Sequence, residues 1–226
     1  MAEKHTIQEV IAERAARELT GPCIVNLGIG IPTLVAKYID DKDVYFHTEN
    51  GLLGVTDVEE DEIDPNRVNA GKLPVGETIG ASFFNSADSF AMIRGGHVDV
   101  AILGVLQVDQ KGIIANWAVP GKNIMGVGGA MDLLVGAKKV IVTTTHTTKD
   151  GKSKLLKACT FPITSTRSVD MIITELAVFE VADGKLKLIE LMPGATIEMV
   201  REKTEAEFIE QRIDDNEDSF AKYIRS

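Results

Sequence analysis

Glu49 is the side chain with the clearest potential for covalent chemistry. It follows the apolar run Val44 to His47, which is typical of a buried strand, and it precedes Asn50-Gly51. Folds of the α/β class place their sites at the carboxyl ends of strands, and a glutamate carboxylate is ionised at neutral pH, so it needs no general base to act as a nucleophile. A glutamate in a turn is more often a solvated charge, so its position alone leaves both interpretations open.

A second candidate is the glycine-rich segment Gly126 to Leu133, which contains Gly128, Gly129 and Ala130. Glycines that open a helix leave backbone N–H groups free to point at an anion. In acyl chemistry such donors form an oxyanion hole. A tight turn packed on a neighbouring strand explains the same glycines, so both interpretations stand at this point.

Three common site motifs are missing from the sequence. Gly28-Ile29-Gly30 is not a dinucleotide loop, because Thr33 stands where the third glycine would be and no acidic partner follows a second strand. No G-x-x-x-x-G-K-[ST] phosphate loop and no G-x-S-x-G nucleophile elbow occurs. The Rossmann, P-loop and α/β-hydrolase classes are therefore rejected.

The four histidines, His5, His47, His97 and His146, are too scattered to indicate a metal site. Each is more often structural than functional. His47 has the best functional chance, because it lies two residues before Glu49. We expect no metal.

Two further segments admit two interpretations each. Arg94, in front of Gly95-Gly96, can bind an anion or can cap the C-terminus of a helix. Trp117 is most simply a core or interface aromatic residue.

Composition limits the function classes. The chain has 226 residues, 44% hydrophobic content and a net charge of −10, so a substantial core is expected, whereas a nucleic-acid partner is not. Two cysteines give no disulfide framework. The N-terminus lacks a signal-peptide pattern, and no stretch of about 18 apolar residues could span a bilayer, so we expect a cytoplasmic protein without a membrane partner.

The elements that must position these residues follow from apolar periodicity and turn signals. Strands alternate with helices early and an Asp183-Gly184 hairpin comes late, which predicts one α/β layered domain over residues 1–226, with a largely parallel or mixed sheet flanked by helices. The expected helices are Thr6 to Leu19, Pro32 to Tyr38, Phe83 to Arg94, a short one within Gly126 to Gly136, and one from Thr196 through Phe208. The expected strands are Cys23 to Leu27, Val44 to His47, Val98 to Val105, Lys139 to Thr144, and two within Ile172 to Met192.

From about residue 7 to residue 210 the chain resembles the B (beta) subunits of the 3-oxoacid CoA-transferases, which are class I CoA-transferases. The resemblance covers the bacterial B subunits, such as those of butyrate–acetoacetate enzymes, and the C-terminal half of the fused mitochondrial succinyl-CoA:3-oxoacid enzyme. Six segments occur in the family's order and at about its spacing. They are Asn26 to Pro32, Glu49 to Gly51, Val68 to Lys72, Ser89 to His97, Ala115 to Trp117 and Gly128 to Leu133.

The resemblance implies that Glu49 is the catalytic glutamate, which carries a covalent glutamyl-CoA thioester during the transfer of CoA. It implies that Gly129 and Ala130 belong to the loop that faces the thioester oxygen. Coenzyme A is then a substrate, and no cofactor is expected. The resemblance also implies a hetero-oligomer with a separate CoA-transferase A (alpha) subunit, which works on small acyl-CoA and carboxylate substrates of ketone-body and short-chain fatty-acid metabolism.

The resemblance further implies that Asn26, Lys72 and Gly128 bind coenzyme A. Because CoA is anionic and the chain is acidic, such a site must be locally basic or must use backbone N–H groups. Lys72 would supply a cation.

Two departures from the family pattern affect these expectations. Thr48 replaces the usual serine before the glutamate and keeps a hydroxyl, so activity is expected to survive. The segment Gly54 to Asp57 replaces the usual Gly-x-Gly-Pro and can reshape the acyl pocket. The substrates therefore stay open between acetoacetate with succinyl-, acetyl- or butyryl-CoA, and 3-oxoadipate. A non-catalytic ligand-binding domain of the same fold is the alternative from another class.

Overall fold

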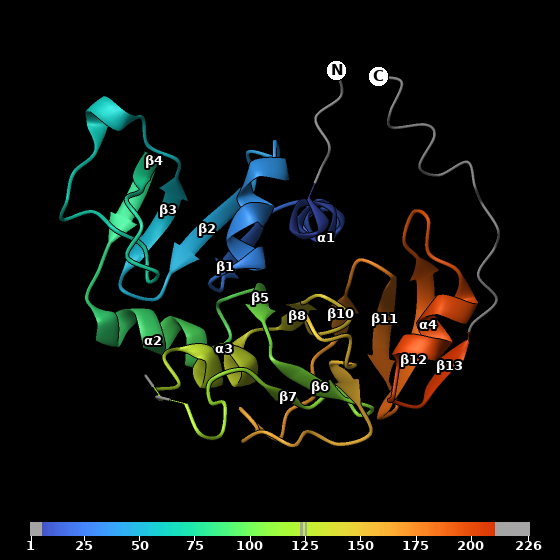
Figure 1. The fold of residues 1–226 in the computed structure, drawn as a ribbon. Coiled ribbons are helices and arrows are strands. Elements are labelled where there is room, and N and C mark those ends of the chain that lie inside the picture. The colour runs from blue at the N-terminus through green and yellow to red at the C-terminus, as the bar shows by residue number, and fades with distance from the viewer. Residues whose placement is uncertain (1–5, 123, 125, 211–226) are drawn as a thin grey trace.

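The centre of the molecule is a ten-stranded sheet with the strand order β13-β12-β11-β10-β8-β5-β1-β2-β3-β4 (Figure 1). Helices lie on both of its faces, which confirms the predicted α/β class with a mainly parallel sheet. The structure is a computed structural model that describes residues 6–122, 124 and 126–210. His5 lies outside the described residues, and a single domain over residues 1–226 stays a prediction.

Five neighbouring strands in the middle of the sheet run parallel to one another. They are rich in valine and isoleucine, which fit a pleated surface that is buried on both faces. Four of the five confirm predicted strands, although the one expected over Val98 to Val105 is shorter. Met171–Ile173 is a separate strand that was not predicted, because the first of the two strands expected within Ile172 to Met192 is divided by a turn at Thr174 and its two parts pair antiparallel. The five are β1 (Cys23–Leu27), β2 (Val44–Thr48), β5 (Val100–Gly104), β8 (Lys139–Thr143) and β10 (Met171–Ile173).

Antiparallel strands extend the sheet on both sides. Asp183 and Gly184 form the predicted hairpin turn, with φ of 56° and 68°. Two positive φ values are what a two-residue turn between twisted strands requires. The flanking strands are β3 (Leu52–Thr56), β4 (Gly76–Phe83), β11 (Ala177–Ala182), β12 (Lys185–Leu191) and β13 (Phe208–Glu210), the last parallel to β12.

Six helical segments accompany the sheet in the described residues. Thr6 caps the first helix, because its hydroxyl accepts from the backbone N–H of Glu9. The Glu9 carboxylate in turn accepts from the backbone N–H of Thr6. The segment predicted to begin at Pro32 is a 3₁₀ helix. The segments are α1 (Ile7–Ala16), η1 (Ile31–Tyr38), η2 (Glu60–Glu62), α2 (Ser86–Arg94), α3 (Ala130–Gly136) and α4 (Ile197–Lys203). None of the described helices is long and apolar enough to cross a membrane.

Three predicted helices are longer than the observed ones. The helix expected to reach Leu19 ends at Ala16. The helix expected from Phe83 begins at Ser86, because Phe83 ends β4 and the Asn85 side chain caps the helix by accepting from the N–H of Asp88. The helix expected to run through Phe208 ends at Lys203. Phe208 instead lies in β13. Between this strand and the helix, the backbone N–H groups of Glu205 and Ala206 donate to the carbonyl of Leu155 and so turn the chain.

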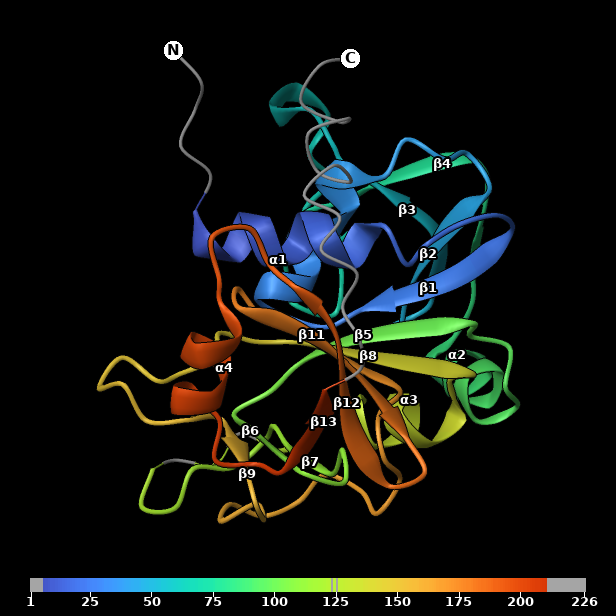
Figure 2. The same ribbon diagram turned by 90° about the vertical axis from the view of Figure 1, so that its right-hand side faces the viewer.

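The core has one layer on each face of the sheet, and β5 contributes to both. Val100 and Ile102 pack toward α1, whereas Ala101 and Leu103 pack on the opposite face, as the two-residue period of a strand requires. Helices α1 and η1 cover the first face, and α2 and α3 lie against the second (Figure 2).

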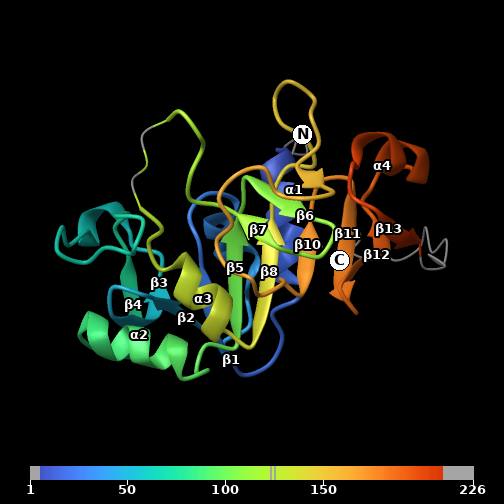
Figure 3. The same cartoon turned by 90° about the horizontal axis from the view of Figure 1, so that it is seen from below.

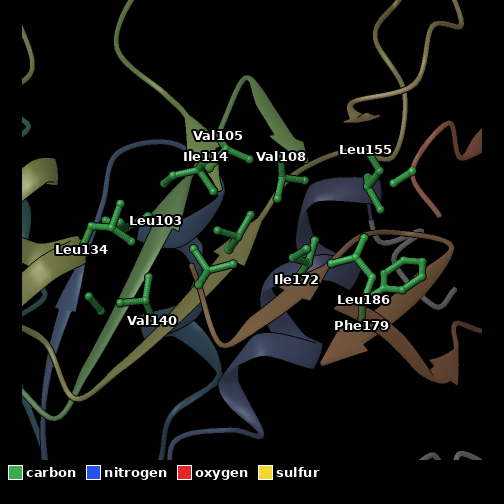
Figure 4. Close-up of a cluster of buried hydrophobic side chains, with 14 of the residues drawn as sticks. Leu103, Val105, Val108, Ile114, Leu134, Val140, Leu155, Ile172, Phe179 and Leu186 are labelled. Carbon is green, nitrogen blue, oxygen red and sulfur yellow. The ribbon is translucent and has the colours of Figure 1, made fainter. Parts of the chain in front are cut away.

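A second, three-stranded sheet packs against the layer on the second face; it faces the viewer in Figure 3, which shows the molecule from below. In Figure 4, Leu103, Val140 and Ile172 of the central strands point into the same layer as Ile114 and Leu155 of the small sheet. Side chains of this size each contribute about 1.5–3 kcal/mol when fully buried, so this layer stabilises the sheet whose strand ends form the candidate site. The strands are β6 (Gln107–Asp109), β7 (Ile114–Ala115) and β9 (Leu155–Leu156).

Candidate functional site

The ends of β1 and β2 bring three polar side chains together. The two strands are parallel neighbours in which Asn26 pairs with His47. The amide nitrogen Nδ2 of Asn26 lies 3.1 Å from Oε2 of Glu49 and 3.2 Å from Nδ1 of His47. Asn26 is fully buried, and Glu49 is half-buried in the turn after β2. The carboxylate is therefore held by a donor from the neighbouring strand.

The turn that carries Glu49 depends on Gly51. Its φ is 118°, in the region that favours glycine. A Cβ atom at this position would overlap the carbonyl oxygen of Phe84. That close approach allows the backbone of Gly51 to accept from the N–H of Phe84 at 3.0 Å, and so the turn is fixed to the segment that leads into α2.

Thr48 and Asn50 tie the same turn to the loop at residues 68–71. The Thr48 hydroxyl donates to Oδ1 of Asn50 at 2.8 Å and accepts from the N–H of Ala70 at 2.9 Å. The Asn50 amide donates to the carbonyl of Val68 at 2.7 Å. The hydroxyl that Thr48 shares with serine is therefore used structurally.

Gly129 packs directly against the Glu49 carboxylate. A Cβ atom at Gly129 would lie 3.2 Å from Oε1 of Glu49. Its φ of −79° is open to any residue, so glycine is needed here for space and not for conformation. Helix α3 begins at Ala130, and the amides of its first turn have no partner within the helix. The predicted pairing of a glutamate with a glycine-opened helix is thus present in the structure.

An open cavity of about 850 Å³ lies over these groups; we call it the Glu49 cavity. Its walls come from the ends of β1, β2 and β5, from η1 and from the loops before α3. Among the predicted site residues, Glu49, Gly128, Gly129 and Ala130 line it. Asn26 reaches it through its bond to Glu49.

Lys72, like Asn26, is a predicted site residue that does not itself line the Glu49 cavity. It lies beside the cavity in a turn with a φ of 63°, and its neighbours Ala70 and Gly71 are the ones on the wall. Of the lining residues that the structure describes, Lys37 carries the positive charge, whereas Glu49 and Asp57 are acidic. The cavity is not strongly basic, so an anionic ligand must rely on backbone N–H groups.

His47 is buried behind Glu49. Its Nε2 lies 3.0 Å from the Ser89 hydroxyl, and its ring stacks on Phe84 at 6.0 Å between centroids. Burial lowers the pKa of His47 to about 4, so the ring is neutral at neutral pH. His146 is equally buried, between the hydroxyls of Thr174 and Thr204. Its pKa is also lowered to about 4, mainly by burial.

Arg94 lies in the last turn of α2, where a positive charge complements the helix dipole. Its Nε donates to Oδ1 of Asp132 at 2.7 Å, and its guanidinium lies 5.6 Å from the centre of the Phe90 ring. Because Asp132 lies in α3, the ion pair links the two helices beside the site.

Sequence reasoning missed part of the cavity wall. Trp117 lines the Glu49 cavity and donates through Nε1 to the carbonyl of Ile163 at 3.3 Å, although a structural role was the simpler expectation. Val55, Thr56 and Asp57 also line the wall, and they belong to the segment Gly54 to Asp57 that the sequence had marked as able to reshape the acyl pocket. Trp117 lies in one of the segments that resemble the family, but a single aromatic residue after a short strand does not by itself indicate a place in the cavity wall.

The described residues contain no group of three or more His, Cys, Asp or Glu side chains placed to hold a metal ion. The absence of a metal stays a prediction. Cys23 and Cys159 are both free and partly buried, and burial raises the pKa of the Cys159 thiol to about 11.

Comparison with known proteins gives a consistent result. The coenzyme A transferase family model matches residues 8–203. The B subunit of the succinyl-CoA:3-ketoacid coenzyme A transferase of Helicobacter pylori is 53% identical over 203 residues, which cover 89% of this chain and 98% of that protein. The beta subunit of the acetate CoA-transferase of Escherichia coli is 50% identical over 199 residues, covering 88% and 91%.

Among solved structures, the apoenzyme of the acyl-CoA transferase YdiF from Escherichia coli O157:H7 superimposes with a TM-score of 0.74 at 24% identity. The alignment covers 94% of this chain and 43% of the longer YdiF chain. At this identity the likeness establishes the fold alone.

Proposed function

The chain belongs to the coenzyme A transferase family, and we propose that it is the glutamate-bearing B subunit of a 3-oxoacid CoA-transferase. In this proposal CoA moves between an acyl-CoA and a free carboxylic acid by way of a thioester on Glu49. The observation that carries the proposal is the contact of the Glu49 carboxylate with Asn26 on one side and Gly129 on the other, inside an open cavity.

The first half-reaction starts from the ionised carboxylate. One oxygen of Glu49 attacks the carbonyl carbon of the acyl-CoA, and collapse of the tetrahedral intermediate expels CoA as its thiolate and leaves a mixed anhydride. The thiolate then attacks the glutamyl carbonyl. The bond between the glutamyl carbonyl carbon and the bridging oxygen breaks, so the acyl group leaves with that oxygen as the first carboxylate product. A glutamyl-CoA thioester remains. The acyl bond energy is kept in the thioester, and no ATP is required.

The second half-reaction reverses these steps with another carboxylic acid. That acid attacks the glutamyl thioester, and the released thiolate attacks the new anhydride at its acyl carbon. The products are the second acyl-CoA and the free Glu49 carboxylate. Ping-pong kinetics follow, because the first product leaves before the second acid reacts.

Each tetrahedral intermediate carries an oxyanion that needs donors. The amide of Asn26 already lies 3.1 Å from a Glu49 oxygen, so we assign it the oxyanion that forms on the glutamyl carbon. The free amides at the start of α3, near Gly129 and Ala130, would serve the oxyanion on the substrate carbonyl. One such donor is typically worth about 2.7–4 kcal/mol.

Coenzyme A enters this proposal as a substrate, and no cofactor is required. We propose that Gly128 and Asn26 contact the thiol end of the CoA arm, because both lie at Glu49 or on the cavity wall. Lys72, in the turn next to Gly71, would meet a more distant part of CoA at the rim.

For the substrates we propose a 3-oxoacid such as acetoacetate, paired with succinyl-, acetyl- or butyryl-CoA. The names of the similar proteins, a succinyl-CoA:3-ketoacid transferase and an acetate transferase, support this class. 3-Oxoadipate is the alternative acceptor. A substrate panel that includes acetoacetate and 3-oxoadipate distinguishes the two.

We propose a CoA-transferase alpha chain (the A subunit) as the obligatory partner, in a cytoplasmic hetero-oligomer that we call the two-chain complex. Two observations support it. The similar proteins are themselves named as the B or beta member of an enzyme with more than one subunit. In addition YdiF, which has the same fold, is more than twice as long as the aligned region.

Borohydride inactivation tests the proposed thioester. The two-chain complex is incubated with acyl-CoA and then treated with sodium borohydride, which reduces a glutamyl thioester. We expect irreversible loss of exchange activity only when acyl-CoA was present. Glu49→Gln, which keeps the size and the hydrogen bonds of the side chain, is expected to lower exchange by about 10⁴-fold or more. Substantial exchange in that variant would refute the role of Glu49.

A further inference from the structure

A series of hydrogen bonds runs from α2 to the Glu49 carboxylate. The Ser89 hydroxyl meets Nε2 of His47 at 3.0 Å, Nδ1 of His47 meets the amide nitrogen of Asn26 at 3.2 Å, and that nitrogen meets Oε2 of Glu49 at 3.1 Å. The three inner residues, Ser89, His47 and Asn26, are buried, at 0%, 3% and 0% exposure.

The chemistry of an amide fixes the direction of these bonds. Nδ2 of Asn26 is a donor with two protons, and the Glu49 carboxylate can only accept. His47 must therefore offer its Nδ1 as an acceptor, so its proton lies on Nε2 and is donated to Ser89. The other end of the amide, Oδ1 of Asn26, is buried and has no partner among the described residues.

An unpartnered Oδ1 means that nothing on that side of the amide holds its orientation. The orientation is held by the two acceptors, Glu49 and His47, on the Nδ2 side. If the amide rotated by half a turn, Oδ1 would face the Glu49 carboxylate, which would lose its donor and lie against a second acceptor. Leaving buried polar groups unpaired costs about 1–3 kcal/mol each.

One of the two acceptors changes during the proposed reaction. Glu49 loses its negative charge when it becomes an anhydride and then a thioester, and its attraction for the Asn26 amide falls accordingly. His47 does not take part in bond formation, so its Nδ1 is the acceptor that persists. The stacked Phe84 ring and the Ser89 hydroxyl keep the imidazole in place.

We propose that His47 is a positioning residue for the transfer reaction: by accepting from Asn26 it keeps the second amide proton directed at the glutamyl oxygen when Glu49 is uncharged. The inference rests on the proposed function of Glu49. It adds a residue that takes no part in bond formation, although it lines the Glu49 cavity, and that determines whether the oxyanion on the glutamyl carbon finds its donor.

Two substitutions at His47 separate positioning from packing. His47→Leu fills the space but offers no acceptor, whereas His47→Gln offers an oxygen to Asn26 and an N–H to Ser89. In the two-chain complex we expect His47→Leu to lower kcat by about 10- to 100-fold with little change in KM for acyl-CoA. We expect His47→Gln to stay within about threefold of the wild type.

His146→Leu is the matched control. His146 is as buried as His47 and is held by two hydroxyls, but it does not line the Glu49 cavity. Its replacement is expected to lower the melting temperature at least as much as His47→Leu and to leave kcat unchanged. If the two leucine variants lose kcat in proportion to their stability, or if His47→Leu keeps its kcat, the inference is overturned.

The formation of the glutamyl adduct separates this inference from the proposed function. A wild-type complex that forms no adduct with acyl-CoA contradicts the function itself. A wild-type adduct that forms at the same rate in His47→Leu contradicts the positioning role alone.

A measurement that does not depend on folding of the leucine variant is the tautomer of His47. In the ¹⁵N-labelled two-chain complex, with the His47 signals assigned by their loss in His47→Gln, we expect a protonated Nε2 and a bare Nδ1 at neutral pH. A proton on Nδ1 would overturn the inference.

Discussion

At the scale of single residues, the reactivity of Glu49 depends on the groups pressed against it. Its carboxylate has a donor on one side and the bare Cα of Gly129 on the other. That bare surface lets the carboxylate lie next to the first turn of α3. In the proposed reaction, a larger residue at 129 would occupy the space through which the thioester carbonyl approaches.

Gly129→Ala is therefore expected to impair catalysis more than stability. The added Cβ would lie 3.2 Å from Oε1 of Glu49 and displace the carboxylate by a few tenths of an ångström. Because the φ of −79° suits alanine, the fold has no reason to change. We expect kcat to fall by about 10- to 100-fold and the melting temperature to change by less than about 3 °C. Wild-type kcat in this variant would show that the close packing of Gly129 against the Glu49 carboxylate does not affect catalysis.

The two buried histidines predict a pH dependence of stability. Both have a pKa of about 4 in the fold, below the ordinary value of 6.5, so the unfolded chain binds protons more strongly between these values. The stability that the two neutral histidines contribute is fully present above about pH 6.5, and it is lost as the pH falls toward 4. From about pH 7 to about pH 5 each histidine should lower the free energy of unfolding by about 2 kcal/mol.

Urea unfolding of His146→Gln checks this effect. The variant lacks one of the two groups, so its loss of stability between about pH 7 and about pH 5 should be smaller than that of the wild type by about 2 kcal/mol. Equal losses in both proteins would mean that His146 is not held neutral by the fold.

Part of the candidate site could be predicted from residue types. The rest depends on how distant segments are brought together in the fold. Glu49 and the glycines at 128–129 could be singled out as candidates from their residue types, but only the resemblance to the CoA-transferases favoured a functional role over a simple turn. The contact between Asn26 and His47 could not, because it depends on the register of β1 against β2. Trp117 lines the cavity only because the chain after β7 returns to it.

At the scale of elements, the site is an assembly of strand ends and the turns that follow them. Parallel pairing places Asn26 beside His47, and the turn at 49–51 directs Glu49 back over them. The loop at residues 68–71 and the segment before α2 hold that turn from two sides. A change in one turn should thus affect stability and activity together.

Gly51→Ala is expected to show this coupling. The new Cβ would overlap the Phe84 carbonyl in a backbone of positive φ, so the turn must move. We expect a loss of about 3 kcal/mol or more in urea unfolding and little remaining exchange activity.

Gly121→Ala is the control for backbone strain alone. Gly121 also has a positive φ, 80°, but a Cβ there meets nothing within 4 Å. Its cost should be about 1–2 kcal/mol. Equal losses in the two variants would mean that the contact with Phe84 does not matter.

Elements with a strong pattern were predictable, and those without one were not. Buried β-branched strands, the Thr6 cap and the Asp183-Gly184 hairpin were recognised from local sequence. Strand β4 was missed, because most of its residues are exposed and Gly80 interrupts it. The start of α2 was misjudged because Phe83 and Phe84 continue an apolar pattern, although Asn85 is the cap.

At the scale of the whole molecule, the sheet presents one functional edge. The carboxyl ends of β1, β2 and β5 meet there, and the Glu49 cavity opens above them. Its described lining has one lysine and two acids, so charge on this chain alone would not account for the proposed binding of CoA. The proposed partner chain would supply the remaining contacts.

The proposed transfer of CoA depends on one covalent step, which mass spectrometry can observe. The two-chain complex is mixed with an acyl-CoA, trapped and digested, and the peptide that contains Glu49 is weighed. We predict an increase by the mass of bound CoA in the wild type and none in Glu49→Gln. Exchange activity without any adduct on that peptide would contradict the role of Glu49 as the residue that carries CoA.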